Sequence, residues 1–160
     1  NLGRSCQLYG RIRNRKEEYR GKARQYLESV LQIPDLPPLS IIFAATYLDL
    51  GMIYLEMAAE HEPDLYLPKA VHSFTEAINR YREIEYPEVH ILAQSSLGEA
   101  HYRIAKLNPD SLSETERINH LELAQSTLEE TCRALGSDKG AALYHKTGLN
   151  RVMYRWIWPK

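Results

Sequence analysis

The histidines and acidic residues are the side chains of this sequence best suited to chemistry, yet their spacing matches no catalytic or metal-binding motif. The sequence has no HExxH, GxGxxG, GxSxG or phosphate-binding P-loop pattern. His90 and His101 are eleven residues apart and so near one face of a helix, but a metal ion needs further ligands. Paired acids such as Glu129 and Glu130 are typical of a helix surface. We therefore predict a protein that is not an enzyme and holds no metal ion or cofactor.

The two cysteines, Cys6 and Cys132, lie far apart and form no CxxC spacing. We expect each to pack as a small apolar residue, which favours a cytoplasmic location over an oxidising compartment. The sequence has no signal peptide and no run of about 18 apolar residues, so we expect no membrane span. Because the chain begins at Asn1 without a Met, we interpret it as a trimmed chain or a segment of a longer protein.

The net charge of −1 conceals an uneven distribution. Residues 1–24 carry eight Lys or Arg against two Glu, residues 25–132 carry six against eighteen acids, and residues 133–160 carry six against one. An acidic middle between two basic ends favours charged partners.

The basic residues of the first segment are interleaved with Tyr9 and Tyr19, a mixture that can bind phosphates and stack bases. Nucleic-acid binding is therefore one hypothesis, which the near-neutral isoelectric point disfavours. The alternatives are a solvated helix face or a surface that pairs with the acidic middle of a neighbouring copy. The basic residues of this first segment are Arg4, Arg11, Arg13, Arg15, Lys16, Arg20, Lys22 and Arg24.

The elements that position these side chains are all predicted to be helices, because apolar residues recur at helical spacing and no useful stretch alternates with period two. Proline and glycine mark the ends of the helices, and Ser113-x-x-Glu116 is a possible capping box. The result is about seven helices joined by short loops, around residues 2–12, 19–30, 41–61, 68–86, 87–107, 113–135 and 138–156.

A two-helix pattern occurs twice. Each copy has a Leu-Gly pair in its first helix and a small residue followed by a large one in its second. The copies are Leu50-Gly51-x-x-Tyr54 with Ala70-x-x-x-Phe74-x-x-Ala77, and Leu97-Gly98-x-x-His101 with Ala124-x-x-x-Leu128-x-x-Thr131. Weaker copies are Tyr9-Gly10-x-x-Arg13 with Ala23-x-x-x-Leu27-x-x-Val30, and Thr147-Gly148-x-x-Arg151 without a second helix.

This pattern resembles the tetratricopeptide repeat. The resemblance implies one domain that forms a right-handed α-solenoid of antiparallel helix pairs, with repeats at about 1–38, 39–86, 87–136 and a partial one at 137–160. The glycines at 10, 51, 98 and 148 are 41, 47 and 50 residues apart, longer than the standard repeat of about 34, so an array of another helical-hairpin type is the alternative. Residues 86–107 are similar to the longer repeats of bacterial signalling proteins.

The glycines have a physical role in this interpretation. We expect each to let the second helix approach where a Cβ would intrude, with Phe74 or Leu128 filling the neighbouring gap. One pair cannot bury its apolar face alone, so the pairs are expected to stack.

The resemblance also implies a function, because the first helices of such repeats line a concave groove that binds a protein or peptide. The groove positions would be Gln7, Arg11, Asn14, Arg15, Asp49, Met52, Ser95, Ser96, Glu99, Arg103, His145 and Lys146. Chaperone-binding members hold a peptide carboxylate with Lys and Asn, and this sequence has Gln7, Arg11, Leu48 and Asp49 at those places. We therefore expect a scaffold or adaptor that does not bind a chaperone tail.

The C-terminus is aromatic. Trp156 and Trp158 stand on the last predicted turns of an unfinished repeat. We expect them to form an interface, including self-association. The alternative is that they fold back on Leu143 and the preceding helix, closing the core within this chain.

Overall fold

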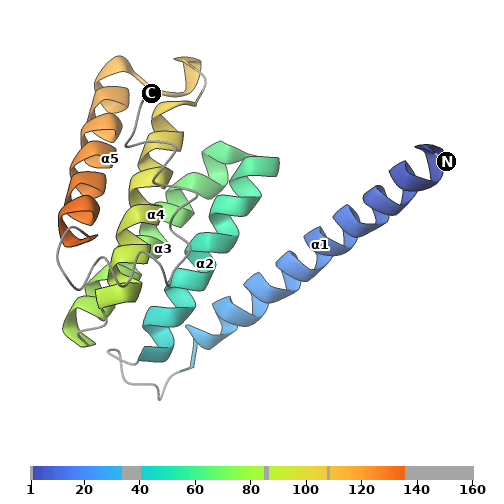
Figure 1. Cartoon of the computed structure of the whole chain (residues 1–160), viewed down its shortest axis with the longest axis horizontal. Coiled ribbons are helices and arrows are strands. Elements are labelled where there is room, and N and C mark those ends of the chain that lie inside the picture. The colour runs from blue at the N-terminus through green and yellow to red at the C-terminus, as the bar shows by residue number, and fades with distance from the viewer. Residues whose placement is uncertain (1, 34–40, 85–86, 108, 136–160) are drawn as a thin grey trace.

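The computed structural model describes residues 2–33, 41–84, 87–107 and 109–135. These residues form five α-helices and one short 3-10 helix, with no strand among them. Helices α2 to α5 pack side by side and run alternately up and down, while the first half of α1 stands away from them (Figure 1). The prediction of an all-α fold is confirmed for this part of the chain.

The N-terminal region departs from the prediction of two short helices. Residues Leu2–Val30 form one continuous helix, α1. Residues 13–19 contain neither Pro nor Gly to break the helix, and Lys22 with Glu18 and Arg24 with Glu28 add ion pairs one turn apart. The helix hairpin expected for the first repeat is therefore not formed. The seventh predicted helix, in residues 138–156, lies outside the described residues.

The next two helices are α2 (Ile41–Glu60) and α3 (Pro63–Ile84). Only His61 and Glu62 separate them, and Glu62 takes the left-handed backbone conformation with φ 43°. Helix α3 begins earlier than predicted. The prediction placed Pro68 at the start of the helix, but Pro63 takes that position. Pro68 instead lies inside α3.

Helix α4 (Pro87–Ala105) and helix α5 (Glu114–Leu135) are joined through the 3-10 helix Pro109–Ser111. The predicted capping box is confirmed. Ser113 N donates to Glu116 Oε2 at 2.9 Å, and Glu116 N donates to Ser113 Oγ at 3.3 Å. Arg117 of α5 donates to the carbonyl of Ala105 at 2.9 Å, so one orphan carbonyl at the end of α4 is satisfied from the next helix.

The core lies between α2, α3 and α4. Leu67 and Phe74 of α3 are at most 1 % exposed. Helix α2 is long and apolar enough to span a membrane by length and composition, but half of that stretch is buried in this core. The alternation of small and large core residues lets three helices approach closely. Buried members include Ala44, Leu48, Leu50, Tyr54, Leu55, Ala70, Ala77, Tyr81, Ala93, Ala100 and Ile104.

Both predicted glycine crossings are present. A Cβ on Gly51 would lie 2.6 Å from Cε1 of Phe74, and a Cβ on Gly98 would lie 2.8 Å from Cγ of Leu128. Each distance is shorter than any normal carbon contact, so only glycine fits without a shift of the neighbour. The prediction that Phe74 and Leu128 fill the space beside these glycines is confirmed.

Candidate functional site

Helices α2 and α4, the first helices of two successive pairs, are held together by polar contacts. Arg103 Nη1 donates to the backbone carbonyl of Leu55 at 3.2 Å, and the same guanidinium forms an ion pair with Glu99 one turn earlier. Ser96 Oγ lies 3.7 Å from the sulfur of Met52. The structure thus brings four sequence-predicted groove residues together, namely Met52, Ser96, Glu99 and Arg103.

These residues form part of a surface of mixed character, which we call the α2/α4 surface and define by Asp49, Met52, Glu99 and Arg103. Met52 is 39 % exposed and the side chain of Arg103 is 37 % exposed. Asp49 is exposed one turn before Met52, and partial burial raises the pKa of its carboxyl. A thioether flanked by carboxylates and a guanidinium can contact both apolar and charged groups of a ligand.

Ser95 and Ser96 are placed differently from the expectation of a groove lining. They are 2 % and 7 % exposed, and both hydroxyls donate to the carbonyl of Leu92 at 2.9 Å. Small polar side chains satisfied within their own helix allow α4 to pack closely. Ser95 and Ser96 are therefore buried in the packing of α4 and do not line an open groove.

Of the remaining predicted groove residues, only Arg15 has a described side chain, and it lies on α1 rather than on α2 or α4. The side chain of Arg15 is exposed. The side chains of Gln7, Arg11 and Asn14, on the same helix, are outside the described part. His145 and Lys146 also lie outside the described residues.

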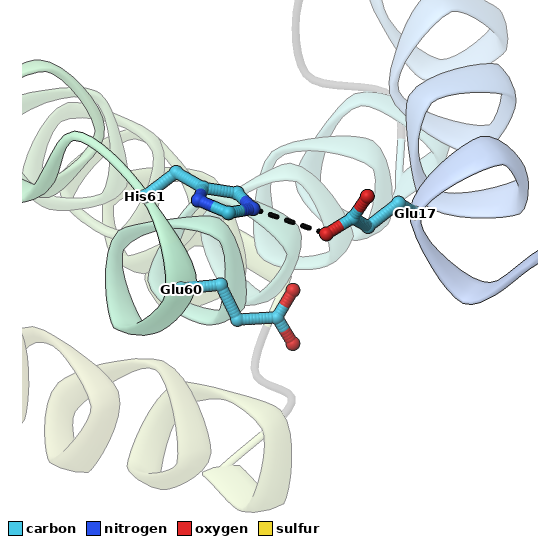
Figure 2. Close-up of side chains that lie close together, drawn as sticks. All are labelled: Glu17, Glu60 and His61. Atoms are coloured by element: carbon cyan, nitrogen blue, oxygen red, sulfur yellow. Dashed lines mark hydrogen bonds and ion pairs between the residues drawn. The ribbon is translucent and has the colours of Figure 1, made fainter. Parts of the chain in front are cut away.

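A charged cluster that the sequence did not predict joins α1 to the end of α2 (Figure 2). His61 Nε2 lies 3.0 Å from Glu17 Oε1, and the carboxylate of Glu60 stands beside them. The ligand atoms of these three residues lie within 4.8 Å of one another, as a metal site would require. However, Arg20 Nη2 donates to both oxygens of Glu60, at 2.9 and 2.8 Å. A cation would have to share Glu60 with this guanidinium, so the cluster is better suited to joining two helices.

Arg20 is the central residue of this joint. It is only 8 % exposed, and its Nε also lies 3.7 Å from Glu56 Oε2. Farther along α1, the carboxylate of Glu28 accepts a 2.7 Å hydrogen bond from the hydroxyl of Tyr54 on α2. Burial and this neighbouring carboxylate raise the pKa of Tyr54 to about 12. These contacts join residues 26 to 40 positions apart, which no local motif could reveal.

His101 and His120 form a second unpredicted pair, between α4 and α5. Their Nδ1 atoms are 2.9 Å apart, so one ring donates a hydrogen bond and the other accepts it. His101 is 8 % exposed. Burial, and to a lesser extent His120, lower the pKa of His101 to about 4. The sequence held one indication that His101 is buried. His101 occupies the same position in its copy of the repeat as the buried Tyr54 does in the other full copy.

No family model, curated protein or solved structure gives a significant match to this chain. The resemblance to tetratricopeptide repeats therefore rests on its own residues and on their packing.

Proposed function

We propose that this chain is a tetratricopeptide-like scaffold that binds a protein segment on the α2/α4 surface and has no catalytic role. The observation that carries the proposal is the pair of glycine crossings, Gly51 on Phe74 and Gly98 on Leu128, at equivalent places in two successive helix pairs. Two pairs that repeat the same crossing support a right-handed solenoid, in which first helices share one face. A cytoplasmic setting belongs to the same proposal.

The chemistry of the surface indicates the kind of segment that it would bind. Met52 offers a flexible apolar contact. Asp49 offers a carboxylate to a basic group, while Arg103 is already engaged by Glu99 and by the carbonyl of Leu55. A segment with an apolar side chain next to a Lys or Arg would match this arrangement.

Nucleic-acid binding by the basic residues of α1 is the second candidate. Support for it is reduced because three of the basic side chains have acidic partners, namely Arg20 with Glu56 and Glu60, Lys22 with Glu18, and Arg24 with Glu28. Phosphate binding would have to displace these carboxylates. Arg15 and Lys16 remain exposed.

The test is a selection of peptides on the immobilised chain, followed by hydrogen–deuterium exchange with and without a selected peptide. We expect the peptide to slow exchange in α2 and α4 and to leave α5 unchanged. The affinity for the peptide should vary little with salt concentration, because the peptide would neutralise few charges on the α2/α4 surface. Protection confined to α1, or affinity for generic RNA that falls steeply with salt, would favour the nucleic-acid candidate instead.

A further inference from the structure

Equivalent residues of α3 and α5 have different environments. When Ala70 of α3 is aligned with Ala124 of α5, as the repeat requires, Leu67 corresponds to Leu121. Leu67 is 1 % exposed, whereas Leu121 is 41 % exposed. Helix α3 packs against both α2 and α4, while α5 packs chiefly against α4 among the described helices. Helix α5 therefore lacks the second neighbour that α3 has.

A hollow lies where that second neighbour would be. Its volume is about 790 Å³, and its lining is mostly apolar. An apolar hollow that continues into an exposed leucine is typical of a surface covered by another element. The lining residues are Tyr102, Leu121, Ala124, Gln125, Leu128, Glu129, Cys132 and Arg133.

We propose that residues 138–158 of this same chain cover the hollow, as α4 covers α3. The segment follows α5, which ends at Leu135, and a connection of about two residues is within the length that joins antiparallel helices. As a helix of about 20 residues it would be roughly 30 Å long, which matches the 22 residues of α5. Its sequence supplies the apolar residues Leu143, Leu149, Val152 and Trp156 at helical spacing.

Charge supports this occupant over a second copy of the acidic bundle. Helix α5 carries five Glu against two Arg. Residues 138–158 carry four Lys or Arg against the single acid Asp138. Opposite charges therefore flank the apolar contact, whereas two copies of α5 would place like charges together. The proposal concerns how the chain covers its own core and does not depend on what the α2/α4 surface binds.

Intrinsic fluorescence provides a direct test, because the only two tryptophans of the chain, Trp156 and Trp158, both lie in this segment. In the dilute monomer of residues 1–160 we expect blue-shifted emission with little quenching by acrylamide. Leu121→Glu should shift the emission to the red and increase the quenching constant several-fold. Leu123→Glu is the matched control, since Leu123 is 47 % exposed on the same helix but does not line the hollow. It should leave the emission unchanged.

A second measurement on the unaltered hollow guards against variants that fail to fold. Cys132 lines the hollow, so in a Cys6→Ser background its thiol should react with a disulfide reagent at least ten times more slowly than in urea. Freely quenched tryptophans together with a fast-reacting Cys132 in the dilute monomer would overturn the proposal. Blue emission that appears only as concentration rises and a dimer forms would assign the hollow to a second copy, and would also overturn it.

Discussion

Gly51 of α2 faces the ring of Phe74 on α3 so closely that a Cβ on Gly51 would lie 2.6 Å from Cε1 of the ring. Phe74 is fully buried, so any shift of the ring would press on neighbouring core side chains. The close packing of α2 against α3 at this point therefore depends on the absence of a side chain at Gly51.

Gly51→Ala should destabilise the protein by about 1–3 kcal/mol in a denaturant titration, because overpacking exceeds the roughly 1 kcal/mol that Ala gains over Gly in a helix. Gly21→Ala on α1 is the control. Nothing lies within 4 Å of a Cβ there, so the same change should stabilise the chain slightly. Equal effects at the two sites would show that Gly51 does not lie at a tight crossing.

Gly98→Leu should cost about 2–4 kcal/mol, since an entire side chain must fit where a Cβ already lies 2.8 Å from Leu128. Gly98→Ala should cost less than Gly51→Ala, because the half-buried Leu128 can rotate away more easily than the ring of Phe74. The midpoints of urea unfolding of the three variants give the comparison. An unchanged midpoint for Gly98→Leu would contradict the crossing.

Stability should fall between about pH 6.5 and pH 4 because of His101. The folded protein holds this histidine neutral with a pKa of about 4, whereas the unfolded chain binds its proton near pH 6.5. The unfolded state thus takes up more protons as the pH falls, and the lost stability amounts to about 3 kcal/mol by pH 4. His101→Gln should flatten this part of the curve. A variant with the same pH dependence as wild type would assign the effect to other groups.

The joint between α1 and α2 should depend on Arg20. Arg20→Ala removes a buried guanidinium that serves two carboxylates, and should destabilise the chain by about 1–3 kcal/mol. Exchange of amide hydrogens in residues 15–30 should accelerate at the same time. Lys22→Ala is the control, because Lys22 pairs with Glu18 on the exposed face of the same helix. If both variants behaved alike, the Arg20 network would not be what holds α1.

The parts of this fold that could be predicted are those marked by a local motif or by a repeated pattern. The capping box of Ser113 and Glu116 needs only a three-residue spacing. The close helix contact at Gly98 was indicated by the position of this glycine in the repeat. The pairing of Glu17 with His61 spans 44 residues and depends on how two helices meet. The spacing of apolar residues and the composition of the chain do not indicate which helices will contact one another.

The N-terminal region and the surface show the same limit. A Tyr-Gly motif at residues 9–10 indicated a hairpin, but a hairpin needs a break that residues 13–19 do not supply, so α1 continues through them. Ser95 was predicted to line a groove from its place in the repeat, yet its hydroxyl donates to a carbonyl of its own helix, so the side chain can be buried at little cost. Met52 reaches Ser96, and Arg103 reaches the carbonyl of Leu55, only because two successive pairs stack.

The most direct test of the central claim is the affinity of a selected peptide for Met52→Glu, measured by fluorescence anisotropy. Leu65→Glu on α3 is the matched control, since Leu65 is 46 % exposed against 39 % for Met52 and lies outside the α2/α4 surface. Binding on the α2/α4 surface predicts at least a tenfold weaker Kd for Met52→Glu, a loss of about 1.4 kcal/mol, and no change for Leu65→Glu. An unchanged Kd for Met52→Glu, with both variants folded by circular dichroism, would contradict the claim.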